Sequence, residues 1–555
     1  MNYLKRHRTR RVPQSVPMPG VGQAPNSAGG FAWAVDDWTR LRRFLVLGSE
    51  GGSYYASEWT LTRENATAVE RCLASDGPRA VAEIVRVSRE GRAPGNDPAI
   101  FALAMAAGLG DEPTRRAALE ALPEVCRIGT HVFRFAQLVE GFRGWGRSLR
   151  RAVGRWYVAQ PVDGLAYQAV KYRQREGVSH RDLLRLAHPA RHVSAGNPTL
   201  EVSEEHGRLF DWIARGGEAE GLPRLVEGFE RAQAATAPAE TAALVRDYGL
   251  PREALRNEHL ASPEVWQALL EDMPMTALVR NLAVLTRVGV VAPGSDGTRT
   301  VVAQLRDHER IRRARVHPVA VLAALRTYQS GRGARGRGEW SPVAAVVDGL
   351  DGAFHAAFGN VEPAGTRLLL GLDVSGSMTA GRVAGVPGLA PRDASAALAL
   401  VTAATEPRHE IVGFYAGRRG WTSRAKSPWA LGKQGLTPLA ISPRQRLDDA
   451  VRAVSDLPFG GTDCALPMLY ARAQEKEIDT FVIYTDSETW AGQVHPAEAL
   501  EEYRQASGIP ARLVVVGMVS NGFTIADPHD PGMLDVVGFD TATPQLVSDF
   551  ARGAL

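Results

Sequence analysis

The sequence predicts two kinds of fold in one chain: an all-α solenoid of the HEAT-like kind, followed by a doubly wound α/β domain. Between residues 97 and 187 the apolar residues recur at helical spacing in six short segments broken by Gly, Pro or Ser. Helices of this kind bury their apolar faces by stacking in pairs. From about residue 366, apolar strand-like runs alternate with amphipathic helical segments, which is typical of a parallel sheet covered on both faces.

Length and charge divide the chain further. With 555 residues, 45% of them hydrophobic, the chain is globular and exceeds a single core. We expect a basic, flexible tail over 1–30, the helical domain over 31–365 and the α/β domain over 366–555. Residues 1–365 carry 48 basic and 40 acidic side chains, and residues 366–555 carry 17 and 21. Of the 65 basic residues, 60 are arginine, which binds phosphate bidentately and stacks on bases. A GC-rich genome explains the arginine preference but not the asymmetry, which favours a nucleic-acid partner for the helical part.

Cysteine content and hydropathy indicate a cytoplasmic protein. Cys72, Cys126 and Cys464 are odd in number and lack the C-x-x-C spacing, which argues against a disulfide framework and against a zinc site. No run approaches the roughly 18 apolar residues of a membrane helix, so no membrane partner is expected. The basic stretch 1–13 is followed by no apolar segment and is not typical of a secretory signal.

The helical part contains one basic constellation. Its expected helices are 97–109, 112–125, 131–142, 147–159, 163–176 and 180–187. A helix over 163–176 would place Tyr167, Lys171 and Arg175 on one stripe. A capping-box start at Ser179 would open the next helix, which carries Arg181 and Arg185 and ends near His188. An aromatic side chain among cations is a typical binding surface for single-stranded nucleic acid; the alternative is a solvated charged face.

The Gly- and Arg-rich interval 330–338 is either an RNA-contacting loop or a solvated connection.

In the α/β part, a set of oxygen-bearing side chains predicts a metal site. Asp373, Ser375 and Ser377 follow the apolar strand that starts at residue 367, Asp486 follows a second apolar run, and Thr462 lies in a Gly-rich turn. The expected helices are 393–405, 445–457, 466–476 and 496–507, and the other strands 411–415, 481–486 and 513–516. Ligands of doubly wound sheets bind at the carboxyl ends of strands, where Asp373 and Asp486 are expected. Oxygen ligands favour a divalent cation such as Mg²⁺. The alternatives are a purely structural ion and a loop that closes the sheet edge without an ion.

Catalysis is not indicated. A phosphatase of the haloacid-dehalogenase type needs a second aspartate two residues after Asp373, but position 375 is serine. We find no P-loop lysine motif and no plausible Ser, His and Asp triad order. We therefore predict a binding protein and not an enzyme.

The metal motif resembles the metal-ion-dependent adhesion site of the von Willebrand factor A domain, with Asp373, Ser375, Ser377, Thr462 and Asp486 in the five positions. Segments 43–55, 171–175, 179–186, 273–282 and 314–318 resemble the TROVE module, and segments 460–464 and 521–528 resemble the A domain that accompanies it. The whole chain is thus similar to the Ro ribonucleoprotein autoantigen family, as a bacterial relative. The arginine-rich run 5–11 has no family counterpart and is interpreted as a disordered, phosphate-binding tail.

The resemblance implies a ring of helical repeats whose two ends are joined by the A domain. Single-stranded 3′ ends of misfolded or precursor RNAs would enter a basic hole, and small Y RNAs would bind outside and block access. RNA-contacting roles carry over to Lys171, Arg175 and His188, and further to Thr130 and Gln137. His188 precedes Pro189 and is alternatively a helix-terminating structural histidine.

The resemblance also implies partners. A 3′ to 5′ exoribonuclease would act with the protein in RNA processing and decay. The metal would keep one position open for an acidic group of a partner. The competing interpretation is a metal-dependent scaffold or adhesion module that binds proteins and no RNA.

Overall fold

The structure is a computed structural model of the full chain. It describes residues 11–48, 66–93, 95–175, 177–189, 202–216, 220–333, 338–358, 361–380, 383, 389–416, 435–442, 445–455, 457, 460–519, 521–539 and 542–554. Most of the basic run 5–11, part of the segment 43–55 and residues 334–337 of the Gly- and Arg-rich interval lie outside these ranges.

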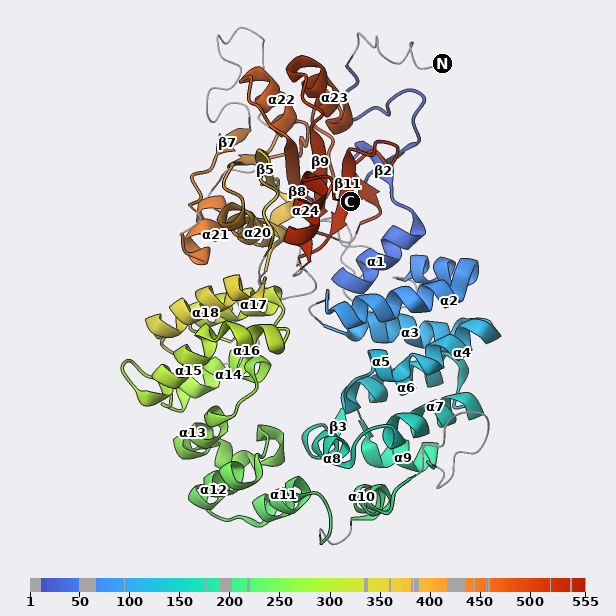
Figure 1. Ribbon diagram of the computed structural model, residues 1–555, viewed down its shortest axis with the longest axis vertical. Coiled ribbons are helices and arrows are strands. Elements are labelled where there is room, and N and C mark those ends of the chain that lie inside the picture. Colours follow the sequence, from blue (N-terminus) through green and yellow to red (C-terminus); the bar gives the residue numbers. More distant parts are fainter. Residues whose placement is uncertain are drawn as a thin grey trace.

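The helical domain forms an arc that leaves the α/β domain on one side and returns to it on the other (Figure 1). Its elements are α1 (Asp37–Leu47), α2 (Thr67–Glu90), α3 (Asp97–Leu109), α4 (Glu112–Glu120), α5 (Leu122–Val125), α6 (Gly129–Arg143), α7 (Arg147–Val158), α8 (Val162–Lys171), β3 (Gln174–Arg175), β4 (Val178–Ser179), α9 (His180–Ala187), α10 (Glu204–Arg215), α11 (Arg224–Ala234), α12 (Pro238–Tyr248), η2 (Arg252–Ala254), η3 (Asn257–Ala261), α13 (Pro263–Glu271), α14 (Met275–Arg287), α15 (Asp296–Arg306), α16 (His308–Arg313), α17 (Pro318–Gln329) and α18 (Ala344–Ala357).

Neighbouring helices stack as the solenoid prediction requires. α3 packs against α2, α4 and α6. Ten consecutive α3 residues from Ala99 to Gly108 are buried, which fits a helix that is apolar on all sides. The expected helix 112–125 is instead two helices, α4 and α5, broken at Ala121 just before Pro123. Proline lacks the amide that would continue the hydrogen-bond ladder.

The α/β domain has a six-stranded sheet in the order β11-β9-β8-β5-β6-β7, parallel except for the β6–β7 pair. Its elements are β5 (Leu368–Asp373), α19 (Ser377–Ala380), α20 (Pro391–Thr405), β6 (His409–Phe414), β7 (Leu436–Pro438), α21 (Leu447–Ser455), α22 (Leu466–Ala473), β8 (Thr480–Thr485), α23 (Pro496–Ser507), β9 (Arg512–Gly517), β10 (Phe523–Thr524), β11 (Met533–Val537) and α24 (Thr543–Ala551). This confirms the doubly wound prediction.

Alternation along the strands divides the core into two layers. Leu370, Leu372 and Tyr484 belong to a buried cluster that contains α20, α21 and α24, whereas Leu369 and Ile483 belong to one that contains α22 and α23. Successive strand residues point to opposite faces, so helices cover both sides. The chain passes from β5 to β6 on one side and later to β8 on the other, which puts the switch point at the carboxyl end of β5.

The N-terminal segment corrects an expectation. Residues 11–30 are not a flexible tail. β1 (Gln23–Pro25) pairs with β2 (Phe31–Ala34), and β2 pairs with β10 of the α/β domain. The segment therefore completes a three-stranded sheet on the α/β domain before the chain enters α1.

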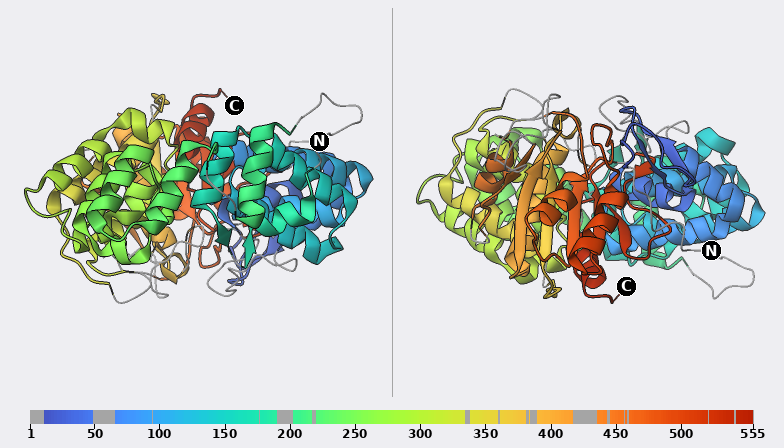
Figure 2. Two further views of the ribbon diagram at one scale, coloured as in Figure 1. Left: turned by 90° about the horizontal axis from the view of Figure 1, so that it is seen from below. Right: turned by 90° about the horizontal axis from the view of Figure 1, so that it is seen from above.

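Both ends of the arc are fixed to the α/β domain. At the start, the Arg43 guanidinium, 1% exposed, donates to Asp535 at 2.9 and 2.8 Å and to the Phe523 carbonyl at 2.9 Å. At the end, Gln329 donates to Asp448 at 2.9 Å and the Leu447 amide donates to Asp351 at 2.7 Å. The arc has two arms, one from α1 to α10 and the other from α11 to α18 (Figure 1). Seen from above, the α/β domain lies between these two helical arms (Figure 2).

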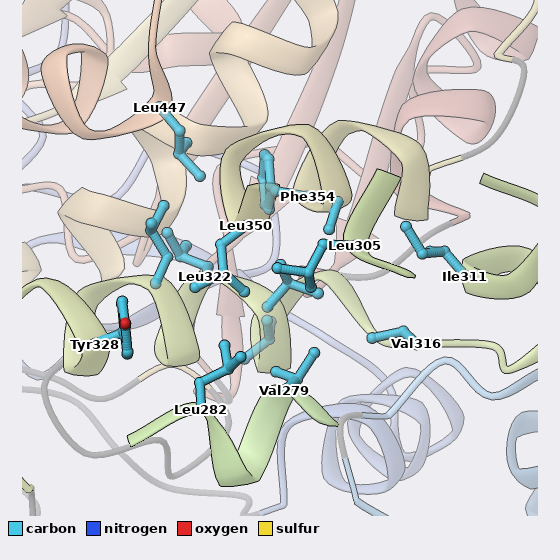
Figure 3. Packing of buried hydrophobic residues seen from close by; sticks show 14 of the residues in the cluster. Val279, Leu282, Leu305, Ile311, Val316, Leu322, Tyr328, Leu350, Phe354 and Leu447 are labelled. Atoms are coloured by element: carbon cyan, nitrogen blue, oxygen red, sulfur yellow. The ribbon is translucent and has the colours of Figure 1, made fainter. Parts of the chain in front are cut away.

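The apolar core is continuous across the second junction. Leu322, Leu350 and Phe354 of α17 and α18 share one buried cluster with Leu447 of α21 (Figure 3). Phe354 also stacks on Phe539 with 6.2 Å between ring centroids. This end of the helical domain is therefore a packed interface and not a flexible tether.

The two arms also touch each other. Arg315 donates to the Arg89 carbonyl at 3.0 Å, and His317 Nε2 lies 3.0 Å from the Arg92 carbonyl. His317 Nδ1 accepts the Val319 amide at 3.2 Å, so Nε2 carries the proton. These bonds join the carboxyl end of α2 to the start of α17.

The three cysteines are free and buried, as the absence of paired spacing predicted. Burial raises the pKa of the Cys126 thiol far above its ordinary value. Within the described ranges, no helix combines the length and apolarity that a membrane crossing requires.

Candidate functional site

Four of the five predicted metal-site residues form one polar network at the carboxyl ends of β5 and β8. Asp373 ends β5 and is fully buried; its carboxylate accepts the Ser375 amide at 2.9 Å and the Thr485 hydroxyl at 2.6 Å. The Ser375 and Ser377 hydroxyls are 3.1 Å apart. Asp486 follows β8, is also buried, and is hydrogen-bonded by Ser377.

The fifth predicted residue, Thr462, lies on the adjoining loop. Its side chain is buried, and its carbonyl accepts the Trp490 and Ala491 amides at 3.2 and 3.1 Å. The Gly376 amide donates to the Gly460 carbonyl at 3.2 Å, which joins this loop to the serine loop. The fold thus brings all three predicted loops to one edge of the sheet.

Electrostatics make this edge suitable for a cation. Burial, and then the charge of Asp486, raise the pKa of Asp373 to about 7. Burial also raises the pKa of Asp486. The pKa of Glu488 is raised to about 7 by burial and then by the negative charge of Asp486. The described residues include no group of three His, Cys, Asp or Glu side chains placed to hold a metal. An ion here would therefore depend on the hydroxyls and on water, a donor set that suits a hard cation such as Mg²⁺.

These pKa shifts predict how metal stabilisation depends on pH. A carboxyl whose pKa is raised by folding takes up its proton in the folded state first, so the metal-free protein loses stability as pH rises from about 4 to about 7. An Mg²⁺ ion bound at this site would compete with that proton. We expect the increase in Tm caused by Mg²⁺ to be larger at about pH 8 than at about pH 6. Thermal melts with and without Mg²⁺ at both pH values measure it; an equal or larger increase at the lower pH would contradict the expectation.

The basic constellation is built differently from the predicted helix 163–176. α8 ends at Lys171, and Arg175 lies on β3 of a short hairpin in which Arg175 pairs with Val178. Gly177, with φ of 83°, supplies the left-handed backbone that such a tight turn favours. The stripe of Tyr167, Lys171 and Arg175 on one helix is therefore wrong, although Lys171 does lie against Tyr167.

Lys171 is held in place. Its ammonium donates to the Tyr167 hydroxyl at 2.9 Å and lies 5.0 and 5.4 Å from the ring centroids of Tyr167 and Tyr172. Burial opposes its charge, yet the hydrogen bond to Tyr167 keeps the pKa of Lys171 above its ordinary value. Lys171 is therefore a fixed, protonated cation, and Arg175 is exposed four residues further on.

Thr130 and Gln137 lie seven residues, about two turns, apart on the same side of α6, whose first turn adjoins the end of α8. The Gly129 amide donates to the Gln168 side chain at 2.9 Å, and β3 packs against α6. Burial lowers the pKa of His131 to about 4, and the charges of Arg127 and Arg175 add to this effect. The fold therefore brings Thr130 close to the hairpin of Arg175.

A cavity of about 1470 Å³ opens between the two arms, and His131 of α6 forms part of its lining. Its lining includes the four arginines Arg89, Arg127, Arg280 and Arg315, and also His131, Trp340, Glu90 and Glu124. Glu124 is paired with Arg89 at 3.0 Å. Sequence reasoning missed these arginines as a group, because nothing local indicates that residues 127 and 280 face one space.

The remaining predicted residues lie on α9. The Ser179 capping box is confirmed: Ser179 caps the Asp182 amide, and the Asp182 carboxylate accepts the Ser179 amide at 2.9 Å. His188 ends α9 with a left-handed backbone, φ 42°, and is exposed, so it does terminate the helix. Arg185 reaches the Ala214 carbonyl at 3.4 Å. Arg181 lines a second groove of about 620 Å³ whose wall also includes Arg173, Arg215 and Trp212.

Comparison with known proteins agrees with this architecture. The TROVE domain family matches residues 24–215 and 250–327, and the Ro60 vWA domain family matches residues 367–551. The RNA-binding protein RO60 of Deinococcus radiodurans is 42% identical over 555 residues, 100% of this chain and 98% of that relative. The RNA-binding protein RO60 of Caenorhabditis elegans is 34% identical over 617 residues, 98% of this chain and 92% of that relative.

A solved structure agrees as well. The crystal structure of the Deinococcus radiodurans RO (RSR) protein matches with a TM-score of 0.69 and 42% identity, covering 94% of this chain and 100% of that one. Both domains are matched in the order in which they occur here. The chain belongs to the Ro60 family, in which a TROVE domain is combined with a von Willebrand factor A domain.

Proposed function

We infer that this chain, an RNA-binding Ro protein, holds single-stranded 3′ ends of misfolded or precursor RNAs at the opening between its two helical arms. The observation that carries this inference is the cavity lined by Arg89, Arg127, Arg280 and Arg315, with Arg175 close enough to its His131 wall to lower the pKa of that histidine. In this proposal the arms and the α/β domain form a ring, closed by the contacts of Arg315 and His317 with α2.

The chemistry of the opening suits a flexible strand. Arginine forks bind phosphate oxygens bidentately, and Trp340 and Tyr167 offer aromatic faces for bases. Contacts to phosphate carry no sequence information, so binding should be strong at low salt and weakly sequence-dependent. The proposed activity is binding, and no catalytic step is assigned; the relatives are likewise named RNA-binding proteins.

We further propose that small Y RNAs bind the outer helical surface, and that the second groove, lined by Arg173, Arg181 and Arg215, is part of that binding surface. A Y RNA there would limit access to the opening. The protein would deliver captured RNA ends to a 3′ to 5′ exoribonuclease, in the cytoplasm.

For the α/β domain we propose a divalent cation, Mg²⁺, held by Asp373, Ser375, Ser377, Thr462 and Asp486. When bound, it would offer a position to a carboxylate of a partner protein.

Sequencing of RNA crosslinked to the protein in cells tests the function. We expect structured RNAs and RNA precursors with unpaired 3′ ends, crosslinked within residues 127–175. The competing function, a metal-dependent scaffold without RNA, predicts protein partners that are lost with a chelator and no RNA above background. Absence of crosslinked RNA would therefore contradict the proposal.

A further inference from the structure

One buried side chain from the N-terminal segment joins two of the metal-site loops. Gln14, 0% exposed, donates through Nε2 to Asp463 Oδ1 at 2.8 Å and to the Val494 carbonyl at 2.7 Å. Its Oε1 accepts the Gly492 amide at 3.3 Å and the Thr489 hydroxyl. Asp463 follows Thr462, and residues 489–494 follow Asp486. Gln14 is therefore bonded to both loops at once.

The neighbouring residues of this segment reach the same loop. Asn26 donates to the Thr489 carbonyl at 2.8 Å, and the Ala28 amide donates to Glu488 at 3.1 Å. Gly30 lies so close that a β-carbon there would come within 1.9 Å of the Thr489 carbonyl and 2.8 Å of the Trp490 α-carbon. Residues 14–30 thus form one wall of the loop that carries Asp486.

We propose that Gln14 is a positioning residue for the metal site, and that docking of residues 14–30 and binding of the metal stabilise each other. This inference rests on the proposed metal site. The proposed cation ligands lie on three loops, and Gln14 links two of these loops through Asp463, Thr489, Gly492 and Val494, which are outside the proposed ligand set. Outer partners of this kind orient ligands and are typically worth about 10- to 100-fold in metal affinity.

The coupling would extend to the helical domain. The segment continues through β2 directly into α1, whose Arg43 is bonded to Asp535 of the α/β domain. The two equilibria are reciprocal. If docking of residues 14–30 raises the affinity for the metal by some factor, bound metal raises the equilibrium constant for docking by the same factor. A bound metal would thereby tighten the junction at which the helical arc begins.

Isothermal titration of Mg²⁺ into the full-length Gln14→Met variant tests the proposal. Methionine retains the length of the side chain but neither hydrogen-bonding group. We expect about tenfold weaker Mg²⁺ binding, the lower end of the range for outer partners. The matched control is Arg11→Gln, in the same segment, which removes only a surface ion pair with Glu502 and should bind Mg²⁺ like the wild type.

Hydrogen exchange of the wild type supplies a second measurement that does not depend on how the variant folds. Saturating Mg²⁺ should slow exchange of amides in residues 14–34, including those of Gln14 and Phe31, which donate to the Gly492 and Gln14 carbonyls. Unchanged affinity in Gln14→Met, or exchange in this segment that is indifferent to Mg²⁺, would overturn the positioning role while leaving the metal site intact. A wild type that binds no Mg²⁺ would overturn both.

Discussion

Replacing Lys171 and Arg175 together by alanine is expected to lower the affinity for single-stranded RNA about a hundredfold. A hydrogen bond to a charged group contributes about 1.5 kcal/mol or more, and two lost contacts make about 3 kcal/mol. The hydrogen bond to Tyr167 already orders the Lys171 side chain, which therefore loses little entropy when it binds RNA. We do not expect a neighbouring side chain to replace this contact in the variant. Fluorescence anisotropy with an oligoribonucleotide that has an unpaired 3′ end measures the change.

Salt dependence separates a lost phosphate contact from a general weakening. Each phosphate neutralised on a single strand contributes about 0.7 to the slope of log affinity against log salt, so the double variant should lose about 1.4. The control removes Arg116 and Arg299, exposed arginines paired with Glu112 and Asp296 and located elsewhere on the arc. If the double variant retained the wild-type affinity and slope, Lys171 and Arg175 would not be RNA contacts.

The arrangement of the proposed metal site was more predictable than that of the proposed RNA surface, because its candidate ligands follow local sequence patterns. The apolar runs that lead to Asp373 and Asp486 identify two strands, and the parallel-sheet rule places the carboxyl ends of both at one edge. The structure adds what spacing does not show: Thr485, the last residue of β8, also hydrogen-bonds Asp373.

The proposed RNA surface was less predictable for two physical reasons. Helical periodicity continued past Lys171 in the sequence, but a short hairpin with Gly177 at its turn competes with the last helical turn and places Arg175 on a strand. The cavity arginines come together only when the two arms meet. Tertiary contacts of this kind produce no periodic pattern in the amino-acid sequence. The docked N-terminal segment was missed for the same reason, since Gln14 has partners more than 400 residues away.

Asp373→Asn is expected to abolish Mg²⁺ binding, with a loss of at least about a hundredfold, because even outer partners are worth up to that much. The asparagine oxygen still accepts the Ser375 amide, so the serine loop should remain in place. The substitution removes one of two buried carboxylates; burial, and then the charge of Asp486, raise the pKa of Asp373. The metal-free variant should therefore melt at a higher temperature than the metal-free wild type at about pH 8, where the Asp373 carboxyl is ionised.

This combination of lost binding and gained stability distinguishes a cation site from a structural polar cluster. If the network merely closed the sheet edge, weakening its hydrogen bonds would lower the Tm, and Mg²⁺ would affect neither protein. Asp449→Asn, an exposed aspartate paired with Arg452 in the same domain, controls for the change of charge. Because the proposed RNA surface lies on the helical arc and not at the sheet edge, the Asp373→Asn variant should bind the oligoribonucleotide with wild-type affinity. A parallel loss of RNA binding would instead mean that the two sites are energetically linked through the junctions at Arg43 and Leu447.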